Sequence, residues 1–158
     1  MKKALLLLLL VAGSLTTYAQ SVVGGGLAYG TDIEEPGIFV EGEFYVKSNF
    51  SIAPDIIIYF VDDAPGVNRG FWEFNANINY YFTEGSAQVY GIGGLNYATA
   101  TVDIDGFGKN SNSELGINLG IGSNFDINSS IMPFAEFKFT ISEFDQAVLK
   151  FGLKYRFK

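Results

Sequence analysis

Apolar and polar side chains alternate along most of the chain after residue 20. Between Glu114 and Ile127, most odd positions are large and apolar, whereas the even positions are glycine, asparagine or acidic residues. A period of two residues is typical of a β-strand with one apolar and one polar face. The alternation predicts eight strands, at residues 22–31, 37–47, 50–61, 70–83, 87–102, 113–127, 131–142 and 146–157. No segment after residue 20 has the periodicity of a helix.

The connections between these strands alternate in length. Residues 47–49, 84–86 and 128–130 are tight turns, whereas 32–36, 62–69 and 103–112 are longer, and the last connection, 143–146, is short and acidic. Bacterial outer-membrane barrels have an even number of strands, with short turns at one end and longer loops at the other. The predicted fold is therefore all-β: an eight-stranded antiparallel up-and-down transmembrane β-barrel.

The direction of the apolar face distinguishes a membrane barrel from a soluble carrier. A lipocalin-like carrier, the alternative, would turn this face inward around a ligand. The interior of eight strands holds little more than its own side chains, and the apolar faces here carry too many large residues to fit. We therefore expect the apolar face to contact outer-membrane lipid. Aromatic residues fall near both expected interfaces, namely Phe44, Phe50, Tyr80, Phe82, Tyr155 and Phe157 at the short-turn end and Tyr29, Phe60 and Trp72 at the loop end.

The first nineteen residues have the organisation of a signal peptide. Lys2 and Lys3 precede an apolar run at residues 4–12, and small residues up to Ala19 form a cleavage site. Such a run is too short to cross a bilayer as a helix but fits the apolar core of a signal peptide. We expect cleavage after Ala19 and export to the bacterial outer membrane, with residues 1–19 as the signal peptide and residues 20–158 as the barrel domain.

Composition excludes several classes of function. The 158-residue chain contains no cysteine and no histidine, and its formal net charge is −7. The commonest metal ligands and acid–base catalysts are therefore missing, and the acidic charge argues against a nucleic-acid partner. We expect no cofactor, no metal and no enzymatic activity. A hydrolase that uses carboxylates alone is the remaining enzymatic alternative, and no pair of carboxylates is assigned to it.

The polar face of the strands carries charged residues that a barrel would turn into its lumen. A buried charge without a partner costs several kcal/mol, so we expect the acids to pair with the bases and plug the lumen. Alternatively, such charges form a gate or solute pathway, which would make the protein a small porin-like channel. The predicted network consists of Glu41, Glu43, Glu73, Glu136, Lys138, Lys150, Lys154 and Arg156.

Residues 103–114 approach the spacing of a calcium-binding loop. Asp103, Asp105 and Glu114 occupy positions one, three and twelve of the EF-hand pattern. Phe107 at position five cannot bind a cation, however, and strands flank the loop in place of helices, so we expect no metal there. The longer loops are acidic and we expect them to be solvated; they carry Asp32, Glu34, Glu35, Asp62, Asp63, Asp103 and Asp105 against Arg69 and Lys109.

Three features carry a resemblance to a known family: the Ala19-Gln20 signal end, the segment from Val89 to Tyr97, and the closing strand from Leu149 to Phe157. The chain resembles small outer-membrane barrels of the OmpA/OmpX type, and more closely the outer-membrane β-barrel domain proteins of Bacteroidota. The resemblance implies that the barrel-assembly machinery recognises the last strand, through Phe151, Leu153, Tyr155 and Phe157. Enzymes among such barrels rely on histidine, which is absent here.

Together these features predict a monomeric integral outer-membrane barrel. Its expected role is structural, or an interaction at the cell surface through the acidic external loops. The sequence identifies no solute and no external partner.

Overall fold

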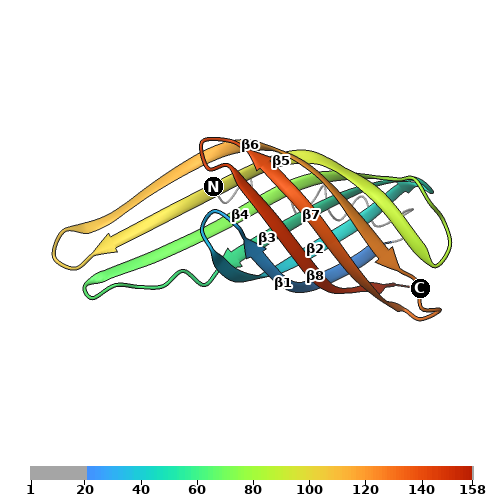
Figure 1. The fold of residues 1–158 in the computed structure, drawn as a ribbon, viewed down its shortest axis with the longest axis horizontal. Coiled ribbons are helices and arrows are strands. Elements are labelled where there is room, and N and C mark those ends of the chain that lie inside the picture. Colours follow the sequence, from blue (N-terminus) through green and yellow to red (C-terminus); the bar gives the residue numbers. More distant parts are fainter. Residues whose placement is uncertain (1–20, 158) are drawn as a thin grey trace, which may run out of the picture.

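The computed structural model describes residues 21–157, and in this part of the chain eight antiparallel strands form one closed barrel (Figure 1). The predicted signal peptide, together with Gln20 and Lys158, lies outside the described residues. The predicted fold class is confirmed. The strands are β1 (Ser21–Gly30), β2 (Glu35–Lys47), β3 (Phe50–Tyr59), β4 (Val67–Tyr81), β5 (Ala87–Ile104), β6 (Gly108–Phe125), β7 (Ile131–Ile141) and β8 (Gln146–Arg156).

No helix among residues 21–157 is long and apolar enough to cross a membrane.

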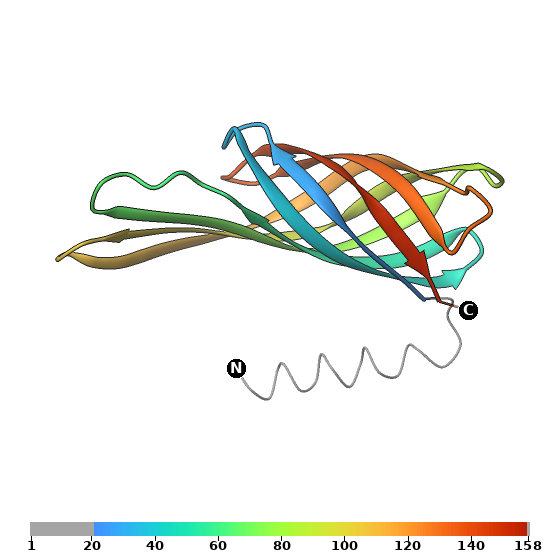
Figure 2. The same cartoon turned by 90° about the horizontal axis from the view of Figure 1, so that it is seen from below.

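Pairing between the first and last strands closes the barrel. The β1–β8 ladder runs from Val22↔Arg156 to Gly30↔Val148, while the other side of β1 pairs with β2. The two described chain ends meet at one end of the barrel (Figure 2), where the N–H of Phe157 donates to the carbonyl of Ser21. We call this end, which also holds the tight turns, the terminal end.

The two faces of the wall alternate as the sequence predicts. Along β4, Phe74 and Ile78 are exposed on the outside, whereas Asn75 and Asn79 are buried in the lumen. The outer surface is therefore apolar and the lumen polar, the reverse of a soluble protein. This arrangement suits a barrel surrounded by lipid, because only lipid stabilises an apolar exterior of this extent.

The prediction of a long loop at residues 103–112 is wrong. β5 continues to Ile104, β6 already begins at Gly108, and the chain reverses at residues 105–107. Gly106 and Gly108 have positive φ angles of 82° and 94°, which glycine adopts without strain. Hydrophobic periodicity could not reveal this hairpin, because residues 109–113 are polar on both faces. β4 also begins earlier than predicted, at Val67, and β3 ends earlier, at Tyr59.

The central strands continue beyond the barrel wall as an arm (Figure 2). Pairing of β3 with β4 reaches only Tyr59↔Phe71, yet β4, β5 and β6 remain paired as far as Val67↔Ile104 and Ile104↔Gly108. We define the arm as residues 67–70, 101–104 and 108–111, the part of these three strands above that last β3 pair. It projects from the end opposite the chain termini, which we call the arm end.

Candidate functional site

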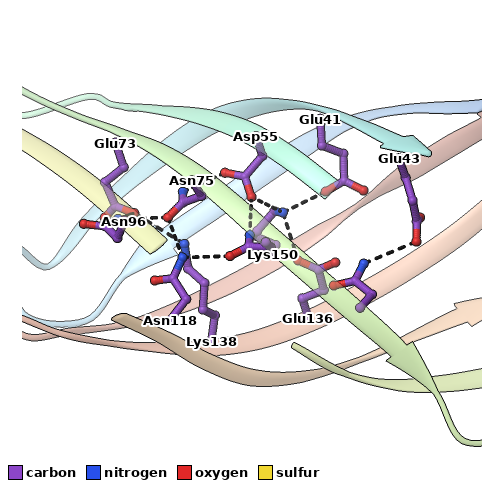
Figure 3. A network of polar contacts seen from close by, with 12 residues as sticks. Glu41, Glu43, Asp55, Glu73, Asn75, Asn96, Asn118, Glu136, Lys138 and Lys150 are labelled. Atoms are coloured by element: carbon purple, nitrogen blue, oxygen red, sulfur yellow. Dashed lines mark hydrogen bonds and ion pairs between the residues drawn. The ribbon is translucent and has the colours of Figure 1, made fainter. Parts of the chain in front are cut away.

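The lumen gathers most of the charged residues that the alternation predicts there. Lys138, Lys150 and Lys154 are almost completely buried, together with five carboxylates: Glu41, Glu43, Asp55, Glu73 and Glu136. All eight lie at inward positions of strands that also face lipid, so the two-residue period of the strands places them inside. Figure 3 shows most of them pointing toward one another from several strands.

Lys150 is surrounded by carboxylates in the middle of this network (Figure 3). Its Nζ lies 2.7 Å from Oε2 of Glu41, 2.9 Å from Oε2 of Glu136 and 3.3 Å from Oδ2 of Asp55. It also lies 4.4 Å from the centre of the Phe39 ring, a cation–π contact that adds to its stabilisation. Sequence reasoning missed Asp55, although its odd position in β3 shares the inward face with Ser51 and Ile57.

Lys154 lies toward the terminal end of the same network. Its Nζ is 2.9 Å from Oε2 of Glu43 and 3.1 Å from Oε1 of Glu41. The rings of Phe134 and Tyr90 lie against the same ammonium, with centres 4.5 and 5.0 Å away. Glu41 therefore bridges Lys150 and Lys154, so the two lysines belong to one connected group.

Lys138 and Glu73 form a separate pair toward the arm end. The Nζ of Lys138 is 3.5 Å from Oε2 of Glu73. Glu73 also accepts hydrogen bonds from the Tyr59 hydroxyl at 3.1 Å, Gln146 Nε2 at 2.7 Å and Asn96 Nδ2 at 3.1 Å. Three neutral hydrogen-bond donors therefore stabilise the Glu73 carboxylate in addition to Lys138.

Neutral donors compensate for the excess of carboxylates over lysines throughout the lumen. Glu43 accepts from the hydroxyls of Ser51 and Tyr81, and the two oxygens of Asp55 accept from Asn75 and Asn77. Such hydrogen bonds stabilise a buried carboxylate, because they compensate for the hydration that it loses on burial. The lumen is consequently filled by a polar network in which buried side-chain amides and hydroxyls outnumber the charged groups.

Arg156 does not join this network. Its Nη2 lies 3.3 Å from Oδ2 of Asp126, at the terminal end, and about a third of its side chain is exposed. Hydrogen bonding from the backbone N–H of Asn128, followed by the Arg156 guanidinium, lowers the pKa of Asp126 from its ordinary value. The expected pairing of Arg156 with a lumen glutamate is wrong because the position falls near the end of β8, where the side chain reaches the turn after β6.

The two ends of the lumen differ. At the arm end, Ile33, Val61 and Phe144 from three loops pack against the buried apolar cluster that contains Tyr59 and Phe71. At the terminal end, a cavity of about 900 Å³ opens between the turns, lined by residues that include Tyr45, Lys47, Tyr81, Asp126 and Arg156. An apolar cap therefore covers one end of the polar network, and a polar cavity lies at the other.

The acidic residues of the calcium-like spacing at residues 103–114 do not lie together in the structure. Asp103 pairs in register with Lys109, and Glu114 with Ala98, so the first and last positions of the pattern lie five residue pairs apart along one hairpin. Within residues 21–157, no group of three or more acidic side chains is arranged to hold a metal ion.

The residues of the expected assembly signal lie on the outer surface. Phe151, Leu153, Tyr155 and Phe157 are all exposed on the last strand or just after it. The rings of Tyr155 and Phe157 contact edge to face at 5.2 Å, and those of Tyr80 and Phe82 do so at 5.4 Å. These pairs form an aromatic rim at the terminal end, as the sequence predicts.

A family model described as the outer membrane protein beta-barrel domain matches residues 5–157. No curated protein matches the chain. Several solved structures are similar. Ail, the attachment invasion locus protein of Yersinia pestis, is 14% identical with a TM-score of 0.68, and 88% of this chain covers 99% of that one. The structure of Ail in complex with the heparin analogue sucrose octasulfate is 16% identical with a TM-score of 0.69, and it covers the same shares of the two chains.

Two further structures extend the likeness. Neisserial surface protein A is 15% identical with a TM-score of 0.71, covering 87% of this chain and 97% of that one. The N-terminal barrel domain of Pseudomonas aeruginosa OprF is 14% identical with a TM-score of 0.68, covering 88% of this chain and 99% of that one. At such low identity the likeness shows a shared fold.

Proposed function

The chain belongs to the outer membrane protein beta-barrel domain family, and from this membership we propose that it is a non-conducting barrel that presents the arm to partners outside the cell. As a member of that family it is an integral barrel of the bacterial outer membrane. Beyond this membership we propose that the lumen is closed, that the arm points out of the cell, that the protein is a monomer, and that it acts at the cell surface.

The orientation rests on a general rule for these barrels. Bacterial outer-membrane barrels have short turns in the periplasm and longer segments outside. A cleaved signal peptide at residues 1–19 would deliver the chain to the periplasm, from where the barrel-assembly machinery would insert it. The tight turns and chain ends share the terminal end, which supports a periplasmic terminal end and an arm outside the cell.

The arm is the observation that carries the surface role. Three strands remain paired above the last β3–β4 pair, Tyr59↔Phe71. This part of the sheet lies beyond the closed wall of the barrel. One hydroxyl pair lies within the arm, with Oγ1 of Thr101 3.1 Å from Oγ of Ser111, and a second lies just below it, with Oγ1 of Thr99 2.9 Å from Oγ of Ser113. A regular, mostly polar sheet that continues beyond the barrel wall supports contact with another molecule.

The filling of the lumen supports a barrel that does not conduct. The three buried lysines, on β7 and β8, reach carboxylates on β2, β3, β4 and β7. Apolar residues from three loops cover the arm end. An ion would have to break several buried ion pairs to pass, and each such break leaves a charge without compensation. This supports the plugged lumen over the porin-like alternative.

The charge of the loops narrows the class of partner. Ail has been observed with a heparin analogue, which is a polyanion. Here the longer loops and arm carry Asp32, Glu34, Glu35, Asp62, Asp63, Asp103 and Asp105 against Arg69 and Lys109. Repulsion between like charges disfavours a polyanion at this end. We therefore propose a neutral or basic partner for this chain.

Cysteine labelling on intact cells tests the orientation and exposure of the arm. The chain has no native cysteine, so Asn110→Cys in the arm and Ser48→Cys in the β2–β3 turn are single reporters. With a membrane-impermeant maleimide, we expect Asn110→Cys to react on intact cells and Ser48→Cys to react only after the outer membrane is disrupted. The opposite pattern, or no labelling of Asn110→Cys until disruption, would contradict the proposed function.

A further inference from the structure

Two tyrosines connect the cavity at the terminal end to the buried lumen network. Tyr45 and Tyr81 both line this cavity of about 900 Å³, and their hydroxyl oxygens lie 2.9 Å apart. We call these two residues the floor of the cavity. The Tyr81 hydroxyl donates to Oε1 of Glu43, which is completely buried, and accepts a hydrogen bond from Nδ2 of Asn124 at 3.1 Å. Because Tyr81 has given its only hydrogen to Glu43, the hydrogen between the two tyrosines belongs to Tyr45, which donates to Tyr81.

This arrangement leaves acceptors at the floor and no hydroxyl donor. The half-buried Tyr45 uses its one hydrogen toward Tyr81, so its oxygen keeps two lone pairs. Asn124 is completely buried, and its Oδ1 has no hydrogen-bond donor within residues 21–157. That oxygen shares a carbon with the Nδ2 that bonds to Tyr81, and it therefore lies beside the floor. A buried acceptor without a donor is costly, and a donor that reached it would remove the cost.

The register of the strands places Asn124 directly beneath the cavity lining. It pairs with Gln88 of β5, and Asp126 follows two residues later, so that the two β6-side residues share a face. Gln88 and Asp126 both line the cavity. Asn124 therefore lies one level deeper than the lining, on the same inward face.

The formal charges beneath the floor favour a cation. The connected group around Lys150 and Lys154 has two lysines against four carboxylates, which leaves two negative charges in excess; the carboxylates are Glu41, Glu43, Asp55 and Glu136. Figure 3 shows Glu43, the member that contacts the floor, at the opposite end of the network from Glu73. At the mouth the charges balance, since Lys47 and Arg156 line it together with Glu84 and Asp126. The field of the network therefore attracts positive charge into the cavity.

We propose that this cavity binds a small molecule through a primary ammonium group, which donates to the hydroxyl oxygen of Tyr45 and to Oδ1 of Asn124. An ammonium has three donors and no acceptor, so it matches a floor that offers acceptors. Tyrosine rings also attract a cation at their faces. A carboxylate or a phosphate at the floor would meet acceptors and the excess negative charge of the network. This site lies at the end opposite the arm and is independent of the arm's direction.

A free amine and the amino end of a short peptide share this chemistry, and three probes distinguish them. L-Alanyl-L-alanine has an ammonium and a carboxylate, N-acetyl-L-alanyl-L-alanine lacks the ammonium, and 1,4-diaminobutane lacks the carboxylate. Each is titrated into the folded, ¹⁵N-labelled protein in detergent micelles, and the side-chain amide signals of Asn124 are followed by NMR.

We expect saturable shifts of the Asn124 signals with the free dipeptide, with diaminobutane, or with both, and none with the acetylated dipeptide. Binding of diaminobutane alone would support a free amine as the ligand. Tighter binding of the free dipeptide would support the amino end of a peptide, whose carboxylate Lys47 and Arg156 then contact at the mouth. Equal shifts from the acetylated and free dipeptides, or no saturable shift with any probe at tens of millimolar, would overturn the inference.

A single hydroxyl provides the matched pair of variants. Tyr45→Phe removes the acceptor and keeps the ring, and we expect it to bind at least about tenfold more weakly, because a hydrogen bond to a charged group is lost. Tyr80→Phe removes a hydroxyl from the exposed aromatic rim and should bind as the wild type does. Equal binding by Tyr45→Phe and the wild type would contradict the assignment.

Two further comparisons locate a failure. If potassium chloride at the same ionic strength shifts the Asn124 signals equally, the site holds an inorganic cation and the proposed ligand class is wrong. The comparison of the two dipeptides uses the wild type alone, so it decides the question even if Tyr45→Phe does not fold. A negative result would leave the proposed function standing, because the arm lies at the other end of the barrel.

Discussion

Lys154 of β8 and Glu41 of β2 meet across Gly24 of β1, which pairs in register with both residues. The Nζ of Lys154 lies 3.1 Å from Oε1 of Glu41. The ion pair therefore spans a strand that contributes no side chain at that level. The lumen network depends on glycine here as much as on the charges themselves.

A side chain at position 24 should therefore destabilise the barrel. A Cβ at this position would lie 2.9 Å from Cγ of Glu41 and 3.1 Å from Cγ of Lys154, both of which are held in buried ion pairs. We expect Gly24→Val to lower the free energy of unfolding in urea by about 1–3 kcal/mol. The matched control is Gly93→Val, because a Cβ at Gly93 meets nothing within 4 Å. Equal effects of the two substitutions would contradict this account of the lumen.

Removing the Lys150 ammonium should lower the free energy of unfolding more than a side chain at position 24 does. Lys150→Met keeps most of the volume but leaves Glu41, Asp55 and Glu136 without the cation that lies between 2.7 and 3.3 Å from each. We expect a loss of about 3–5 kcal/mol in the free energy of unfolding, the usual cost of breaking a buried ion pair from one side. Lys47→Met, at an exposed position, is the control and should change little. A small effect of Lys150→Met would show that the network is hydrated and loosely held.

The Asp126–Arg156 contact predicts a specific dependence on pH. The folded state holds the pKa of Asp126 below its ordinary value, through the N–H of Asn128 and then Arg156. A depressed carboxyl pKa contributes stability that is fully present above the unfolded value of about 4 and is lost as the pH falls through the lower folded value. The difference in unfolding free energy between wild type and Asp126→Asn should therefore be constant from about pH 5 to 7 and shrink below about pH 4. A difference that grew on acidification would contradict the assignment.

Calcium should not bind to the hairpin at residues 103–114. The register places Asp103 opposite Lys109 and Glu114 opposite Ala98, so one cation cannot contact both acids. We expect isothermal titration of the folded protein with millimolar calcium to give no heat beyond dilution. Saturable heat at one equivalent, abolished by Asp103→Asn, would establish a site that the register does not explain.

The sequence alone predicts the barrel wall well and the arm poorly. In the wall, one face meets lipid and the other the lumen, so large apolar residues recur every second position and mark each strand. In the arm both faces are exposed or partly exposed, and residues 109–113 have no apolar member. Only Gly106 and Gly108, with their positive φ angles, indicate a tight reversal, and glycine is too common in this chain to identify it.

The lumen shows a similar division. Inward acids and bases could be read from alternation, because the period of two fixes the face of each residue. Their pairing could not, since it depends on how strands are staggered around the barrel. Arg156 therefore lies with Asp126 in place of a lumen glutamate. Asp55, the third acid on Lys150, stands alone as a charged residue in a mostly apolar strand, where alternation gives it little weight.

Conductance across a planar lipid bilayer is the most direct test of the central claim, a lumen closed by its own side chains. Folded wild-type protein, verified by its shift in gel mobility on heating, should insert and give no stable single-channel steps. The triple variant Glu41→Ala, Lys150→Ala and Lys154→Ala, which removes the connected ion pairs and much of their volume, should give small steps if it remains folded. Stable channels of uniform and sizeable conductance from the wild type would contradict the closed lumen and favour the porin-like alternative.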